Sequence, residues 1–202
     1  MQHLDMGAGQ ARRGVATYHP MRQLLLLRHA KSSWDDPALS DHARPLNARG
    51  RRAAAAMAQA MRELGLAPDI VFVSSARRTL QTLEALTPFE DPALVEPMDA
   101  LYLAPWRSLL ESIQGVPETA RSLLLVGHNP GLHELAMALT GADGMGRGGP
   151  TAQRLAEGYP TGALAEFSIA SPWHLLEPGG GRLIRFIQPR DLLPADSTET
   201  IG

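Results

Sequence analysis

The sequence predicts an α/β protein, a three-layer α/β/α sandwich with a mostly parallel central sheet. Short apolar runs alternate along the chain with longer segments of helical pattern, which is typical of βαβ units. With 202 residues and 44% hydrophobic content, the chain is long enough to bury the core of one sizeable domain. Cysteine is absent, so disulfides, thiolate metal sites and cysteine nucleophiles are excluded.

The expected elements follow from this alternation. Strands are expected at five apolar runs, residues 23–27, 70–73, 122–126, 163–169 and 183–187. Helices are expected at residues 48–64, 77–86, 106–114 and 131–139. The first helix is rich in alanine, and Gly65 and Pro68 suit its end.

Three segments are expected to lack regular structure. Residues 141–158 are rich in glycine and show no apolar period, which predicts a long loop with at most one helical turn. Such a loop is either a surface connection or a lid over a site. A flexible extension is expected over residues 1–20 and a frayed tail over 189–202, which leaves residues 21–188 as a single domain.

The charge balance limits the possible partners. The formal net charge is −2, so no overall cationic field would attract nucleic acid or an anionic membrane. No apolar run approaches the roughly 20 residues of a membrane helix, and residues 1–20 lack the apolar segment of a signal peptide. We expect a cytoplasmic protein in which any anion binding is local.

Cationic or imidazole side chains directly follow three of the expected strands. Arg28 and His29 follow the first, Arg77 and Arg78 follow the second, and His128 follows the third. Because ligands of an open parallel sheet bind beyond the carboxyl ends of its strands, these groups converge if the strands are neighbours. Like charges repel and lower imidazole pKa values, so the cluster implies an anionic ligand.

A phosphoryl group is the anion that fits best. Arginine binds its oxygens bidentately, and the helix N-termini at Arg77 and after Pro130 also favour phosphate. Neighbouring arginines would keep His29 neutral and able to attack phosphorus, giving a phosphohistidine intermediate that water then hydrolyses. Arg28, Arg78 and His128 would hold the phosphoryl oxygens. This scheme requires no metal and no cofactor.

The segment "LRHAKSSW" resembles the Arg-His motif of the histidine phosphatase superfamily, especially its SixA-type phosphohistidine phosphatase branch. The stretches "SSARRTLQT", "LYLAP", "LLLVGHNPGLHELA" and "YPTGALAEF" follow in the expected order. The resemblance implies a phosphoglycerate mutase-like fold, with His29 as the nucleophile, Arg28 as its phosphate-binding neighbour and His128 as the second active-site histidine. The frame "R-T-x-Q-T" selects Arg78 rather than Arg77. Ala30, which replaces the glycine of most members, favours the SixA type.

The resemblance leaves the general acid open. The acid-phosphatase branch carries this acid directly after its second histidine, where this chain has Asn129. A phosphoramidate needs less help from an acid than a phosphoester does, so the absence favours phosphohistidine in a protein as the substrate. Possible substitutes are Glu96, Asp99, Asp35 and Asp36. The alternatives are a small-molecule phosphomonoesterase or mutase, and a phosphoprotein-binding module without turnover.

Residues outside this cluster have weaker assignments. Arg44 and Asn47 precede the first helix and could contact substrate beyond the phosphate. Trp34 is expected to pack and to fix the loop after His29. The charged run Arg49, Arg51 and Arg52 is either a solvated face or a rim for an acidic protein substrate.

Overall fold

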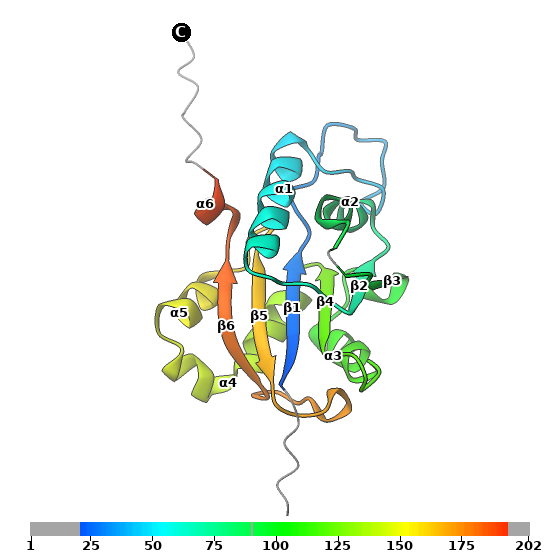
Figure 1. The fold of residues 1–202 in the computed structure, drawn as a ribbon. Helices are drawn as coiled ribbons and strands as arrows, with labels where there is room; N and C mark the ends of the chain where they lie inside the picture. The colour runs from blue at the N-terminus through cyan, green and yellow to red at the C-terminus, as the bar shows by residue number, and fades with distance from the viewer. Residues whose placement is uncertain (1–20, 90, 194–202) are drawn as a thin grey trace, which may run out of the picture.

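The structure, a computed structural model, describes residues 21–89 and 91–193 and is built on a six-stranded sheet (Figure 1). The strands are β1 (Arg22–Arg28), β2 (Ile70–Ser74), β3 (Leu94–Met98), β4 (Ser122–Gly127), β5 (Leu164–Ile169) and β6 (Gly181–Ile187), and their order is β3-β2-β4-β1-β5-β6. Only β5 runs against the others, because it pairs antiparallel with both β1 and β6. The expected mostly parallel sheet is confirmed.

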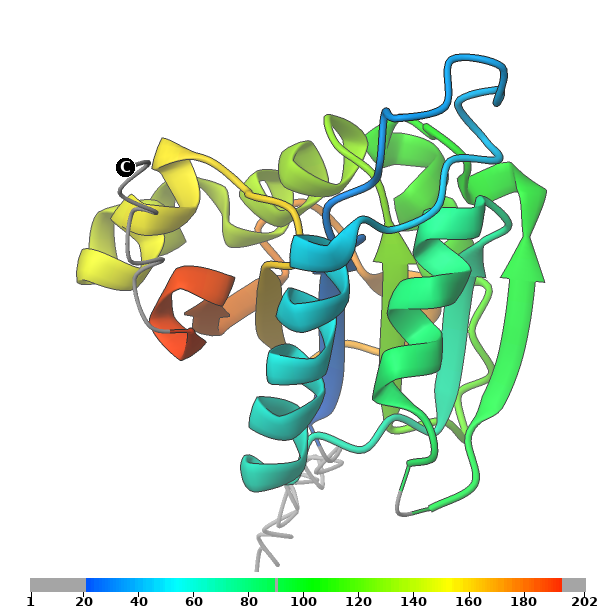
Figure 2. The same ribbon diagram turned by 90° about the horizontal axis from the view of Figure 1, so that it is seen from above.

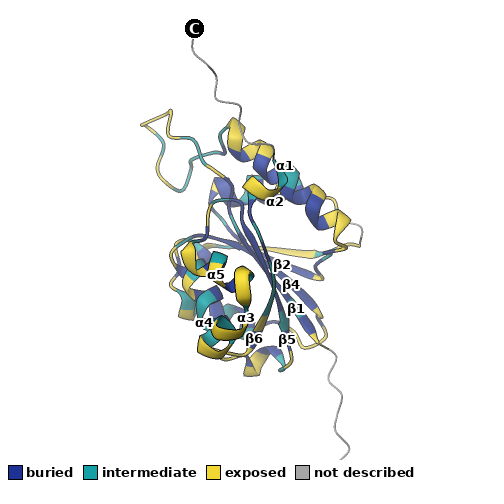
Figure 3. Ribbon diagram, turned by 90° about the vertical axis from the view of Figure 1, so that its left-hand side faces the viewer, coloured by how far each residue is buried: buried dark blue, intermediate teal, exposed yellow. Residues whose placement is uncertain are grey.

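Helices cover both faces of the sheet, which confirms the three layers (Figure 3). On one face lie α1 (Ala48–Glu63) and α2 (Arg77–Leu86). On the other lie α3 (Trp106–Gln114), α4 (Gly131–Arg147) and α5 (Gly149–Glu157). The short helix α6 (Pro189–Leu192) contacts α1, and two 3-10 turns, η1 (Asp99–Leu101) and η2 (Trp173–Leu175), complete the structure.

The four leucines of β1 show why its apolar run is uninterrupted. Leu24 and Leu26 point into the core beneath α3 and α4, whereas Leu25 and Leu27 point into the core beneath α1 and α2. All four are fully buried. A central strand covered on both faces has no solvent side, so its sequence does not alternate between apolar and polar residues.

The expected loop at residues 141–158 is wrong. This segment forms the end of α4 and all of α5, with a kink at Gly141, whose φ is 63°. Glycine costs about 1 kcal/mol per helical position, but burial of Ala152 and Leu155 and packing of both helices against β6 offset that cost. Two buried apolar residues, Ala152 and Leu155, are too few to produce a detectable apolar period in the sequence.

Two further differences occur at the margins of the fold. Strand β3 is not predicted by the sequence, because "LVEPM" contains proline. The structure places it at the edge of the sheet, where it is largely exposed and where proline is tolerated. The tail is not frayed from Pro189, since α6 begins there and Asp191 pairs with Arg154 at 2.6 Å. Residues 1–20 and 194–202 lie outside the described residues.

Within the described ranges, no helix has the length and apolar character needed to cross a bilayer.

Candidate active site

The carboxyl ends of β1, β2 and β4 bring the three predicted loops to one edge of the sheet (Figure 2). In the register of these strands, Leu27 and Val73 both pair with Val126. The residues that follow, Arg28-His29, Ser74 and Gly127-His128, therefore emerge side by side. The predicted convergence depends on β4 lying between β1 and β2, which the strand order provides.

His29 is held by backbone groups in a buried position, with 7% of its surface exposed. Its backbone N–H donates to Gly127 O at 3.1 Å, and its backbone carbonyl accepts from Gly162 N at 3.0 Å. Its ring Nδ1 lies 2.7 Å from Ala30 O. A carbonyl oxygen only accepts, so Nδ1 carries the proton and Nε2 keeps its lone pair.

The segment "RTLQT" at the start of α2 fixes the loop that carries His29. Thr82 Oγ1 accepts from Ala30 N at 3.0 Å and donates to Arg78 O at 2.7 Å. Gln81 Oε1 accepts from Leu46 N at 2.7 Å, on the returning arm of the same loop. The side chains of Gln81 and Thr82 therefore hold the loop in place, and Arg78 is the residue of this motif that faces the site.

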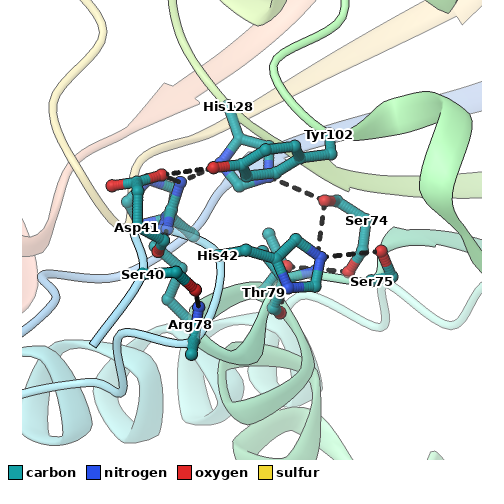
Figure 4. Close-up of polar contacts among 12 residues, drawn as sticks. Ser40, Asp41, His42, Ser74, Ser75, Arg78, Thr79, Tyr102 and His128 are labelled. Carbon is teal, nitrogen blue, oxygen red and sulfur yellow. Dashed lines mark hydrogen bonds and ion pairs between the residues drawn. The ribbon is translucent and has the colours of Figure 1, made fainter. Parts of the chain in front are cut away.

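His128 packs against His29, with ring centroids 5.1 Å apart, and is only 2% exposed. Its Nδ1 lies 3.3 Å from Arg78 Nη2, and its Nε2 lies 2.7 Å from Ser74 Oγ (Figure 4). Because a guanidinium only donates, Nδ1 is the acceptor and Nε2 carries the proton toward Ser74. Ser74, the last residue of β2, thus sets the tautomer of His128.

Asp41 and Tyr102 complete the cluster, and neither was predicted as a site residue. The buried Arg78 donates to Asp41 O at 2.6 Å and to Asp41 Oδ2 at 3.0 Å. Tyr102 donates its hydroxyl proton to Asp41 Oδ2 at 2.6 Å and places its ring edge-on to His128 (Figure 4). "LYLAP" was the one sequence signal for Tyr102; nothing in the sequence distinguished Asp41 from the acids near it.

Arg28 approaches the site from β1. Its Nη1 donates to Tyr159 O at 2.8 Å, and the same carbonyl accepts from Asn129 Nδ2 at 3.0 Å. Its Nε is buried and has no hydrogen-bond partner among the described residues. Burial, followed by the charge of Arg78, lowers the pKa of Arg28.

The two histidines are held neutral. Burial, with Arg78 and Arg28 nearby, lowers the pKa of His29 to about 4. Burial, then His29 and Arg78, lowers the pKa of His128 to about 3. A buried pair of neutral imidazoles near two guanidinium groups can accommodate an anion, and a neutral imidazole can act as a nucleophile.

Comparison with known proteins agrees with this geometry. The sequence profile of the histidine phosphatase superfamily (branch 1) matches residues 24–102. The SixA protein of Nakamurella multipartitia is 31% identical, with a TM-score of 0.74, and the alignment covers 85% of this chain and 98% of that one. The chain belongs to the histidine phosphatase superfamily. Its SixA-type branch, predicted from the sequence, is also confirmed.

Two further relatives support this placement of the histidine phosphatase. SixA of Agrobacterium tumefaciens is 30% identical, with a TM-score of 0.70, over 83% of this chain and 98% of that one. An uncharacterized protein of Mycobacterium tuberculosis is 37% identical over 164 residues, which cover 81% of this chain and all of the relative. The phosphoglycerate mutase-like fold expected from the resemblance is confirmed.

The remaining predicted residues lie around this histidine phosphatase site. Arg77 is exposed, in contrast to Arg78. Asn47 caps α1, accepting from Gly50 N through Oδ1 at 2.7 Å. The guanidinium of Arg44 lies 3.9 Å from the ring centroid of Trp34. Trp34 is 69% exposed, so the expected packing role is wrong: Arg44 covers one ring face, and the loop projects away from the core.

The four carboxylates considered as general acids lie in exposed positions. Asp35 accepts from Ser33 Oγ and Asp36 from Ala38 N, both within their own loop. Glu96 is on the edge strand β3, and Asp99 begins η1. The carboxylate that reaches the site is Asp41, and its pKa is lowered by the hydrogen bond from Tyr102 and by Arg78. In residues 21–89 and 91–193 no three His, Cys, Asp or Glu side chains group closely enough to hold a metal ion.

Proposed function

We propose that this histidine phosphatase is metal-independent, forms a phosphohistidine intermediate on His29, and dephosphorylates phosphohistidine in a protein. The observation that carries the proposal is the hydrogen bond from His29 Nδ1 to Ala30 O, because it leaves Nε2 as a free nucleophile. Arg78 and His128 contact each other beside it, and Arg28 adds a second guanidinium. A cytoplasmic location, where such a protein would remove the signal of a phosphorelay or phosphotransfer system, is part of the proposal.

The proposed reaction has two steps. In the first, Nε2 of His29 attacks phosphorus, and the bond from phosphorus to the substrate imidazole breaks. That ring is protonated on its other nitrogen, so it leaves as neutral imidazole. In the second, water attacks phosphorus, the bond to Nε2 breaks, and dihydrogen phosphate, which carries both protons of the water, is released with neutral His29 restored.

The surrounding cations stabilise charge on the phosphoryl oxygens in both steps. Arg28 and Arg78, whose charges both act on His29, donate to these oxygens. A phosphoryl dianion also raises the pKa of His128, so that Nδ1 gains a proton and donates a hydrogen bond to a phosphoryl oxygen. Another phosphoryl oxygen accepts from Arg78 Nη2, either together with Asp41 Oδ2 or in place of it. Arg44 and Asn47 remain proposed contacts to parts of the substrate beyond the phosphate.

The choice of phosphohistidine over a phosphoester as the substrate rests on the absence of a suitable general acid among the residues described at the site. An alkoxide leaving group requires a proton from the enzyme, whereas a protonated imidazole does not. Asp41 is held ionised by Tyr102 and Arg78, which makes it a poor proton donor. The SixA structures similar to this chain are named for phosphohistidine phosphatase activity.

The substrate proposal is tested with purified protein in EDTA. We expect kcat/KM for a phosphohistidine peptide to exceed that for an alkyl phosphate by at least roughly 100-fold, because the alkoxide leaving group needs the missing acid. Release of inorganic phosphate, corrected for spontaneous hydrolysis, is the measurement. Faster turnover of the alkyl phosphate would favour a phosphomonoesterase, and tight binding of the peptide without turnover would favour a binding module.

The protonation of His29 gives a prediction for pH dependence. An imidazole attacks only when neutral, so activity is present above the pKa and is lost as pH falls through about 4. We expect kcat/KM for an aryl phosphate to have no acidic limb near 6.5 that belongs to the enzyme, and the His29 ring to titrate at about 4 by NMR. Between pH 6.5 and 4 the unfolded chain binds more protons than the native one, so the stability of the fold decreases as pH falls through this range. Circular dichroism at each pH therefore monitors folding. A His29 ring titrating near 6.5 would contradict the prediction.

A further inference from the structure

A cavity of about 550 Å³ lies beside the loop that carries His29. Its lining includes four cationic residues, Lys31, Arg49, Arg52 and Arg190, all exposed toward solvent. The lining, drawn from the described residues, includes no Asp or Glu. A protein with a net charge of −2 thus presents a concentrated positive field at this place.

The cavity is continuous with the active-site loop. Lys31 follows His29 by two residues, and its carbonyl accepts from Asn47 N, at the start of α1. Gly162 bonds to the carbonyls of Arg28 and His29 through its N–H, at 3.1 and 3.0 Å. The cavity wall formed by Pro160 and Thr161 is therefore next in the chain to a residue that is hydrogen-bonded to the backbone of His29.

Gly162 is also the point at which the other walls meet. A β-carbon there would lie 2.9 Å from Pro189 Cγ of α6 and 3.7 Å from Ala53 Cβ of α1. Figure 2 shows α6 beside α1, on the side of the sheet where the chain leaves α5. Helix α6 is held in this place by its capping box and by the ion pair between Asp191 and Arg154.

The ion pair also keeps Asp191 from neutralising the cavity. Asp191 accepts both of its side-chain bonds to Arg154 from Nη2, at 2.8 and 2.6 Å, and a third from Gln188 N. Its neighbour Arg190 is left to face the cavity with Arg52. Lys31, Arg52 and Arg190 bring like charges to one cavity, and an anionic segment bound there would be attracted to them.

We propose that this cavity binds an acidic segment of the phosphohistidine protein, next to the residue that is dephosphorylated. The inference rests on the proposed function and specifies its substrate class. A protein segment fits better than a small polyanion, because the cations are exposed and four apolar residues, Ala53, Pro160, Pro189 and Leu193, share the lining. Exposed cations steer an acidic surface, and the apolar wall accepts the aliphatic side chains beside its carboxylates.

Two synthetic phosphohistidine peptides test the proposal. One is flanked on both sides by aspartate and glutamate, and the other by asparagine and glutamine. We expect the wild type to prefer the acidic peptide by roughly tenfold in kcat/KM at low salt, and this preference to shrink as ionic strength rises. In the double variant Arg52→Glu/Arg190→Glu the preference should disappear, while turnover of the neutral peptide stays within roughly twofold of wild type.

Arg62→Glu provides the matched control. Arg62 is exposed in the last turn of the same helix, about 15 Å along its axis from Arg52. This variant should keep the acidic preference. Equal turnover of both peptides by the wild type, or a preference retained in the double variant, would overturn the cavity assignment and leave the phosphatase intact. Turnover of an aryl phosphate but of neither peptide would instead overturn the proposed substrate, and the cavity assignment with it.

Discussion

His29→Asn is expected to lower kcat/KM for a phosphohistidine peptide by on the order of 10⁴-fold or more. The asparagine amide can still donate to Ala30 O, as His29 Nδ1 does at 2.7 Å, so the loop keeps its main tie. What is lost is Nε2, the atom proposed to attack phosphorus. Single-turnover phosphate release is the measurement, because it detects the residual rate.

Covalent labelling separates a nucleophile from a merely supportive histidine. Wild-type protein quenched in alkali during turnover should carry acid-labile phosphate on His29, whereas the variant should carry none. His133→Gln is the matched control, since His133 is half-buried and its Nε2 contacts Leu155 O on α5 rather than His29, His128 or Arg78. Its activity should stay within roughly threefold of wild type. If His29→Asn retained wild-type turnover, the nucleophile assignment would be wrong.

Arg78→Ala should produce the next largest loss, roughly 10³-fold in kcat/KM. The substitution removes a buried guanidinium that contacts His128 and also ties down Asp41. It therefore deprives the phosphoryl oxygens of one of their donors and releases the loop that holds Asp41. Removing a nearby positive charge should also raise the pKa of His128, which NMR of its ring would detect.

The adjacent Arg77 offers a control at the next position of the same helix. Arg77→Ala should change kcat/KM by less than roughly twofold, because that side chain is exposed. Arg78→Lys should recover only a small part of the loss, since an ammonium cannot reproduce the two-pronged geometry of a guanidinium. Equal effects of the two alanine variants would show that general surface charge, rather than the Arg78 fork, supports turnover.

Local patterns were sufficient where one residue type has one physical use. The leucine run of β1 predicts burial on both faces, and Arg28-His29 directly after the leucines predicts a site at the end of the strand. The start and end of α2 and α3 were likewise predictable, because their apolar periods are clear. Residues 141–158 resisted prediction because their helices depend on packing against β6, which outweighs glycine propensity.

The sequence by itself determined the residues on which the proposed chemistry rests: a histidine at the end of a buried strand, two arginines and a second histidine that together imply a phosphoryl group. Only the tertiary structure decided which other groups meet them. Asp41 and Tyr102 reach Arg78 and His128 from loops distant in sequence, and the tautomers follow from Ala30 O and Ser74 Oγ. Contacts between distant segments leave no local period or spacing, because they are set by the order of strands and the packing of loops.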